Sequence, residues 1–281
     1  MTVSETSGRL RCAGIPNFLG EALMILSHFT GLSEASLLAA RNEDIILSKS
    51  EASAVESALK RRERREPLQY ILGTWEFMGL SFNVSDKCLI PRADTELLCE
   101  TAIEKLPKGG VFLDLCTGSG CIAISVAHYR SDVTVYALEK YPETLQAARE
   151  NACKILKDRD RIRFILADAV SAADAEKYFL KNSFDFIASN PPYVSEDEME
   201  KTDPELSYEP RHALTDGGDG MSIIRGIAEI YPSYLKHGGI LAIEHGAYQG
   251  GAIRRIFSER LSEVETLRDM SALERVTLGR S

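Results

Sequence analysis

VFLDLCTGSGCIAISVAHY, residues 111–129, is the stretch that decides the fold. Its first five residues are mostly apolar and predict a buried strand, and residues 121–129 have the apolar pattern of a helix. The turn between them, residues 116–120, contains Gly118 and Gly120, and glycines let a backbone approach a ligand closely at the start of a helix. A strand, a glycine loop and a helix in this order predict a ligand-binding turn of an α/β fold.

The same alternation of short apolar strands and helices continues along the chain. Such an alternation predicts a mostly parallel sheet that is buried on both faces. Residues 264–270 and 274–280 differ, since they have the pattern of a closing antiparallel hairpin. The expected strands are 111–115, 133–138, 161–167, 184–189 and 239–245, and the expected helices are 121–129, 142–156, 220–235 and 249–260.

The part of the chain before this sheet has a different character. Residues 17–66 have helical apolar spacing, with Ser33 and Ser50 as expected helix starts. Residues 75–90 alternate and contain turn residues, which predicts a β-hairpin, and Thr95 or Asp94 can cap the helix that follows. The expected domains are a helical domain over 1–74, a β-hairpin linker over 75–92 and an α/β domain over 93–281.

Composition limits the classes of function. The chain has 281 residues, of which 44% are hydrophobic, so it can build a full core, and its net charge of −9 argues against duplex nucleic acid and anionic membranes as partners. The run KRRERRE, residues 60–66, is the one basic cluster; we expect a solvated helix face, with a contact to RNA or another partner as the alternative. Six scattered cysteines and no apolar span or leader predict a cytoplasmic protein with reduced thiols and no metal site.

The glycine loop by itself leaves two cofactors open. Residues 118–123 fit the dinucleotide fingerprint GxGxxG/A, so a nicotinamide cofactor is a competitor. Asp114 before the loop gives DxxTGSG, which is typical of proteins that bind S-adenosylmethionine (SAM), and Asp168 ends the third strand where an acid often flanks the adenine. Glu139, 19 residues after Gly120, can accept the hydroxyls of a ribose. A turn without a ligand, and a simple cap at Asp168, are the structural alternatives.

A second motif, Asn-Pro-Pro-Tyr, follows the strand 184–189. Its prolines fix two φ angles and remove two N–H donors, so that the Pro191 carbonyl can be held rigidly. That carbonyl and the side-chain oxygen of Asn190 can each accept one N–H of a planar NH₂ group, which turns the nitrogen lone pair toward an electrophilic methyl group. Tyr193 can stack on the flat acceptor. A proline turn with an Asn cap is the alternative without chemistry.

These motifs together resemble the release-factor glutamine N5-methyltransferases (the PrmC/HemK family). The resemblance extends from about Pro67 to the C-terminus, and the segment IPRADTE (90–96) and the tail RVTLGR (275–280) are specific to the family. It implies a class I SAM-dependent methyltransferase fold: a Rossmann-like, seven-stranded, mostly parallel sheet with an antiparallel C-terminal hairpin, plus a small N-terminal helical domain and a β-hairpin linker. The implied reaction moves a methyl group from SAM to the glutamine of the Gly-Gly-Gln motif in class-1 peptide-chain release factors, with S-adenosylhomocysteine as the other product.

The resemblance also implies the site residues. Those for the cofactor are Asp114, Cys116, Thr117, Gly118, Ser119, Gly120, Glu139, Asp168, Ala169 and Asn190, those for catalysis are Asn190, Pro191 and Tyr193, and those for the substrate are Arg92, Asn190, Pro191, Pro192 and Tyr193. The family usually has Gly at Cys116, Asp at Glu139 and often an aromatic residue at Ala169. Cysteine in place of this glycine should lower the stability of the loop little if position 116 does not need a positive φ. An ion pair that fixes the linker is the alternative reading of Arg92.

Two other functions remain open from the sequence. An amino-methyltransferase acting on adenine in DNA or RNA shares the Asn-Pro-Pro-Tyr motif, but it needs a basic cleft for a flipped base. A non-catalytic subunit with this fold that binds a release factor or the ribosome is the other. For the family function we expect a monomer, with the helices before residue 67 making a second contact to the release factor.

Overall fold

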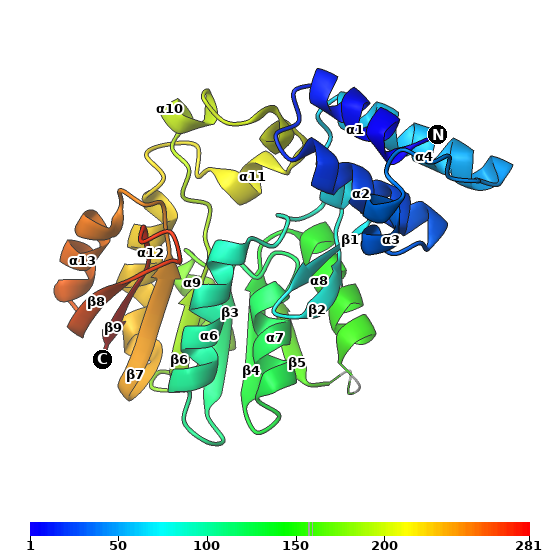
Figure 1. Cartoon of the computed structure of the whole chain (residues 1–281). Coiled ribbons are helices and arrows are strands. Elements are labelled where there is room, and N and C mark those ends of the chain that lie inside the picture. Colours follow the sequence, from blue (N-terminus) through cyan, green and yellow to red (C-terminus); the bar gives the residue numbers. More distant parts are fainter. Residues whose placement is uncertain (157, 159) are drawn as a thin grey trace. The chain divides into compact units, whose positions relative to one another are not determined.

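The computed structural model describes residues 1–156, 158 and 160–281, and its chain forms two compact units (Figure 1). The first unit, called the helical unit below, contains Met1–Thr74 together with Asp203–Tyr208. The second, the sheet unit, contains Trp75–Thr202 and Glu209–Ser281. The chain therefore leaves the sheet unit after Thr202, contributes six residues to the helical unit, and returns at Glu209.

The helical unit is built around apolar residues of five helices, including Leu10, Ile25, Leu37, Leu59 and Ile71. Two of its helices begin with capping boxes, in which Thr2 and Glu5, or Ser48 and Glu51, satisfy the first free N–H groups. Its elements are α1 (Val3–Cys12), α2 (Phe18–Thr30), α3 (Glu34–Ala39), α4 (Lys49–Glu63), α5 (Leu68–Leu72) and η2 (Pro204–Tyr208).

One sequence expectation for this unit needs correction. The helix expected to start at Ser50 begins after Ser48, because the Glu51 carboxylate reaches back to the Ser48 N–H. Ser33 caps α3 as expected. Helix α1 was not predicted, since only Val3 and Leu10 provide large apolar side chains along it.

The expectation of a solvated face for the basic run 60–66 is wrong for Arg62. Arg62 is 4% exposed, and its guanidinium donates to Glu21 and to Glu205. Arg61 pairs with Glu66 of the same run. These cations are therefore largely neutralised by carboxylates of their own unit.

The sheet unit contains the expected seven-stranded sheet, with strand order β5-β4-β3-β6-β7-β9-β8. The pairs from β5 to β7 are parallel, and β9 is antiparallel to both β7 and β8. The strands are β3 (Val111–Leu115), β4 (Thr134–Glu139), β5 (Ile162–Leu166), β6 (Phe184–Ser189), β7 (Leu235–Glu244), β8 (Ser262–Arg268) and β9 (Glu274–Arg280). A mostly parallel sheet with an antiparallel C-terminal hairpin is thus confirmed.

Helices cover both faces of this sheet (Figure 1). Alternate residues of β3 and β6 enter separate cores, Phe112 and Phe186 on one face and Leu113 and Ile187 on the other. Helices α6 (Glu96–Lys105), α7 (Cys121–Tyr129) and α8 (Pro142–Ile155) cover the first face, and α9 (Ala172–Tyr178), α12 (Ser222–Ile230) and α13 (Gly250–Ser258) cover the second. Shorter elements are η1 (Ala93–Thr95), α10 (Glu196–Met199), α11 (Arg211–Leu214) and η3 (Tyr231–Tyr234).

The expected hairpin over 75–90 is shorter than its sequence pattern. It consists of β1 (Thr74–Phe77) and β2 (Leu80–Asn83), and the chain from Val84 to Arg92 forms no strand. Asn151 of α8 fastens this region, because its amide accepts from the Asn83 N–H and donates to the carbonyls of Asn83 and Ser119. In the described ranges, no helix is long and apolar enough to span a bilayer.

Candidate active site

The site lies at the carboxyl edge of the sheet, where the strand order reverses between β3 and β6. Leu115 and Ser189 are paired in register, so the glycine loop and the Asn-Pro-Pro-Tyr motif begin side by side. Open α/β sheets bind ligands at such a reversal. A cavity of about 280 Å³ opens here, within the sheet unit. Its walls include Leu89, Arg92, Thr95, Cys116, Thr117, Gly118, Ser119, Leu138, Glu139, Lys140, Tyr141, Thr144, Asp168, Ala169, Val170, Asn190, Pro192, His212, Ala213, Thr215, Asp216 and Ile223.

The glycine loop needs its glycines for two reasons. Gly118 and Gly120 have φ of +57° and +82°, which favour glycine. A Cβ on Gly120 would lie 2.8 Å from Ile124 Cδ1 and 3.2 Å from Ala148 Cβ, so this position also lets α7 pack against α8. Gly118 has only the Cys116 carbonyl oxygen within 4 Å of such an atom, so its side is open to a ligand.

Asp114 holds this loop from beneath. It is fully buried, and its Oδ2 accepts from the Thr117 hydroxyl at 2.6 Å and from the Ala123 N–H at 3.2 Å. Burial raises the pKa of this carboxyl to about 7. Its Oδ1 is buried with no hydrogen-bond partner in the described chain, and Asp114 is absent from the cavity walls. The acid therefore supports the loop through Thr117 and Ala123, and its expected role toward the cofactor stays a prediction.

Cys116 does have a positive φ, of +59°. Position 116 therefore does need a positive φ, and a cysteine there lowers the stability of the fold. The strain of an L-residue with this φ is about 1–2 kcal/mol. Burial raises the pKa of its thiol above the ordinary value, so this part of the wall is uncharged.

Glu139 is held by backbone donors. Its Oε2 accepts from the Gly118 N–H at 3.0 Å, and its Oε1 accepts from the N–H groups of Lys140 and Tyr141 at 2.9 and 3.1 Å. A carboxylate has about four acceptor positions, so room for a ligand hydroxyl remains on Oε2. Burial raises the pKa of Glu139, while these three N–H groups oppose the rise.

The residues expected beside an adenine are also in the cavity walls. Asp168 pairs with Lys140 at 2.8 Å and accepts from the Val170 N–H at 3.0 Å. Ala169 is buried next to it. Asp168 thus acts at least as a loop and ion-pair residue, which was its structural alternative.

Sequence reasoning missed a stacked pair in the walls. The rings of Tyr141 and His212 lie 3.7 Å apart between centroids, tilted by 31°. Burial lowers the pKa of His212, so its imidazole is neutral at physiological pH. His212 lies on α11, in a stretch of sequence without helical or strand periodicity. Of this pair only Tyr141 stands at a recognisable sequence feature, the start of the helix expected over 142–156.

The acceptor motif is fixed by Thr95. The Asn190 Nδ2 donates to the Thr95 hydroxyl at 3.0 Å, and no described group hydrogen-bonds to Asn190 Oδ1. Thr95 precedes α6 as expected, but its side chain makes no capping hydrogen bond. Both residues line the cavity. The amide nitrogen is therefore engaged with the protein, and the amide oxygen is left for a ligand.

Behind these residues lies Glu244, at the end of β7. It is 1% exposed, its Oε1 accepts from the Tyr193 hydroxyl at 3.3 Å, and the Thr95 hydroxyl lies against it. Burial raises the pKa of Glu244 to about 7, and burial raises that of Tyr193 above its usual range. Pro191, Pro192 and Tyr193 follow Asn190 directly, and of these Pro192 lines the cavity.

Arg92 lines the cavity and is also paired. It donates to the carboxylate of Glu209, which is 6% exposed and also accepts from the Ile90 N–H at 3.0 Å. The ion pair that fixes the linker, which was the alternative reading of Arg92, is therefore present.

Comparisons with known proteins identify the family. The family models of the PrmC N-terminal domain and the methyltransferase small domain match residues 2–73 and 93–243. A release factor glutamine methyltransferase of Geobacter sulfurreducens is 36% identical over 277 residues, covering 98% of this chain and 94% of the relative. One of Escherichia coli is 35% identical over 262 residues, covering 92% and 91%. This chain belongs to the release factor glutamine methyltransferase family.

The fold of a methyltransferase from Pyrococcus furiosus is similar, with a TM-score of 0.53 at 16% identity over 73% of this chain and 90% of that one. The chain is a SAM-dependent methyltransferase. The cavity fits this cofactor, because it combines an open glycine backbone at Gly118, a buried acid at Glu139 and apolar walls such as Leu138.

We predict that replacing Cys116 relieves or worsens the strain of the loop according to the new residue. Cys116→Gly removes the penalty of positive φ but loosens the unfolded chain, so it should leave stability unchanged or raise it by up to about 1 kcal/mol. Cys116→Val should lower stability by about 1–2 kcal/mol, because a β-branched residue is disfavoured at this φ. Thermal unfolding of both variants measures this, and equal stabilities would contradict the strain.

We predict that Glu139→Ala weakens SAM binding by about 1.5–3 kcal/mol, the range for hydrogen bonds to a charged group. Glu139→Asp keeps a carboxylate and should therefore retain most of the SAM affinity of the parent protein. The Glu139 carboxylate has room for a ribose hydroxyl on Oε2, and alanine has no such acceptor. Because the pKa of Glu139 is raised, its carboxylate becomes protonated at a higher pH than that of an ordinary glutamate. SAM affinity should therefore begin to fall at a higher pH as the solution is made more acidic.

Calorimetric titration with SAM between about pH 8 and pH 5 tests both statements. Glu139→Gln is the control, because it has no carboxyl to protonate. A parent protein with the same pH dependence as this control would remove Glu139 from the ribose site.

Proposed function

We propose that this methyltransferase transfers the methyl group of SAM to the side-chain amide nitrogen (N5) of the glutamine in the Gly-Gly-Gln motif of class-1 peptide-chain release factors. The observation that carries the proposal is the orientation of Asn190. Its Nδ2 is engaged by Thr95 while its Oδ1 has no partner among the described residues, so the side chain offers an acceptor at the cavity. An acceptor is what an NH₂ group requires.

A carboxamide nitrogen is a poor nucleophile because its lone pair is delocalised. SAM, when bound, supplies an electrophilic methyl group. Asn190 Oδ1 and the Pro191 carbonyl each accept one N–H of the glutamine amide, which orients the nitrogen and stabilises positive charge as the N–C bond forms. The nitrogen loses its proton after the transfer, and S-adenosylhomocysteine is the other product. No general base is needed before the transfer.

Tyr193 provides the flat surface for the glutamine amide. Its hydroxyl is held by Glu244, and its raised pKa keeps the phenol neutral, so the ring stays in one place as an uncharged stacking partner. A narrow slot of this kind suits an extended Gly-Gly-Gln segment, because two glycines allow a close backbone approach.

The charge distribution favours a protein substrate over a nucleic acid. The net charge is −9, and Arg61, Arg62 and Arg65 of the basic run 60–66 pair with carboxylates of Glu66, Glu21 and Glu205. An adenine methyltransferase needs free cations for phosphates. We expect the protein to act as a cytoplasmic monomer, with residues before 67 adding a contact to the release factor.

We predict that mass spectrometry of a class-1 release factor, incubated with this protein and SAM, finds one added methyl group on the Gly-Gly-Gln glutamine. A release factor with Gly-Gly-Glu at this position is the matched control and should gain none. Methylation of another residue, or of DNA in parallel reactions but not of the factor, would contradict the proposal.

We predict that Asn190→Ala reduces turnover at least about a hundredfold while SAM affinity stays nearly unchanged, since an oriented acceptor is lost. Thr95→Val should reduce turnover less, because the Asn190 amide remains but loses its orienting partner. Thr95→Ser keeps the hydroxyl and should retain most of the activity. Steady-state rates together with SAM titrations separate these effects, and a Thr95→Val rate equal to the parent's would exclude the orienting role.

A further inference from the structure

The acceptor motif is followed by an excursion of the chain, residues 194–215, whose two ends are tied together. The Val194 N–H donates to the Leu214 carbonyl at 2.9 Å, and Val194 forms a β-bridge with Thr215. Arg211 and Glu196 form an ion pair a little further along the two limbs. The base of the excursion is thus directly attached to Tyr193.

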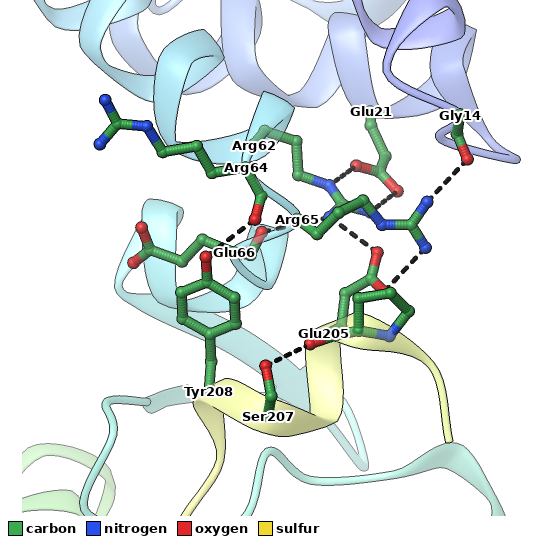
Figure 2. A network of polar contacts seen from close by, with 10 residues as sticks. Gly14, Glu21, Arg62, Arg64, Arg65, Glu66, Glu205, Ser207 and Tyr208 are labelled. Carbon is green, nitrogen blue, oxygen red and sulfur yellow. Dashed lines mark hydrogen bonds and ion pairs between the residues drawn. The ribbon is translucent and has the colours of Figure 1, made fainter. Parts of the chain in front are cut away.

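The tip of the excursion, Asp203–Tyr208, is part of the helical unit. Figure 2 shows how it is held: the Glu205 carboxylate accepts from Arg62 at 2.9 Å and from Arg65 at 2.8 Å, and the Tyr208 hydroxyl donates to the Arg64 carbonyl at 2.8 Å. All three arginine positions belong to the basic run 60–66.

The two arginines form a built socket for Glu205. Arg62 is also fixed by Glu21 at 2.5 Å, and Arg65 donates to the Gly14 carbonyl at 2.8 Å (Figure 2). Because Arg62 is 4% exposed, its ion pairs are screened little by solvent. Although burial alone would raise the pKa of Glu205, the hydrogen bonds from Arg65 and Arg62 lower it, so the carboxylate is charged at neutral pH.

The limb that returns from this tip carries part of the cavity wall. Glu209, the first residue of the sheet unit after the tip, binds Arg92 and the Ile90 N–H. His212, Ala213, Thr215 and Asp216 follow and line the cavity. Both the acceptor motif and one wall of the cofactor cavity are therefore joined to a segment that the helical unit holds.

We propose that Glu205 is a positioning residue: its ion pairs with Arg62 and Arg65 anchor the excursion 194–215 in the helical unit and thereby fix the cavity wall at His212–Asp216 and the acceptor motif at its base. The effect of Glu205 on the acceptor motif rests on the proposed function. Its effect on the cavity wall, and hence on SAM binding, does not. The helical unit then has a role in the site besides any contact with a release factor. A truncation of residues 1–66 removes both roles together, so point substitutions are needed.

The test is Glu205→Ala in the full chain, with Arg61→Ala as the matched control. Arg61 lies on the same helix but binds Glu66 and the Tyr70 carbonyl, not the tip. Glu205→Ala should weaken SAM binding about fivefold or more and raise the KM of a short Gly-Gly-Gln peptide by a similar factor, the size of a modest coupling between distant sites. Arg61→Ala should leave both within about twofold of the parent.

A double-mutant cycle identifies the contact. Arg65→Ala should weaken SAM binding in the same direction, and the double variant Arg65→Ala/Glu205→Ala should lose no more than Glu205→Ala alone, since both remove one interaction. Unchanged SAM affinity in Glu205→Ala, equal losses in Arg61→Ala, or additive losses in the cycle would overturn the proposal. SAM titration needs no methyl acceptor, so a protein that fails to methylate release factors but gives these affinities would refute the proposed function and leave the anchor standing.

Discussion

The parallel pairing of β3 with β6 is the interaction on which the site depends. Leu115 and Ser189 are register partners, and the Ser189 hydroxyl donates to the Leu115 carbonyl at 2.9 Å, so the strands end together. The glycine loop, which we expect to bind the cofactor, and the Asn-Pro-Pro-Tyr motif therefore begin side by side. A shift of one residue in this register would turn Asp114 away from the loop that it supports.

Buried carboxylates hold the loops around this edge. Asp114 fixes the glycine loop, Glu139 collects three backbone N–H groups, and Glu244 supports Tyr193. Burial raises the pKa of each of them, because the surrounding protein disfavours the charged form. Their hydrogen bonds offset part of that penalty and hold the loops in place, and Glu139 is in addition the expected acceptor for a ribose hydroxyl. The excursion 194–215 extends this organisation into the helical unit through Glu205.

Local sequence patterns predicted the sheet, the glycine loop and the acceptor motif, because each depends on residues that are neighbours in the chain. The contacts that were missed join distant segments. Thr95 has the sequence context of a cap but binds Asn190, and His212 meets Tyr141 only in the folded sheet unit. The sequence around Arg62 is that of a solvated helix face, and only the folded chain places Glu21 and Glu205 beside its guanidinium. The positive φ of Cys116 had its only signal in the resemblance, because the family usually has Gly at this position.

The orientation of the acceptor amide is the central claim, and a crystal structure with S-adenosylhomocysteine and a Gly-Gly-Gln peptide tests it most directly. We expect the glutamine amide nitrogen within about 2.7–3.2 Å of Asn190 Oδ1 and of the Pro191 carbonyl, with Asn190 Nδ2 still bound to Thr95. A glutamine side chain held away from Asn190, or an Asn190 amide turned so that Nδ2 faces the peptide, would contradict the account.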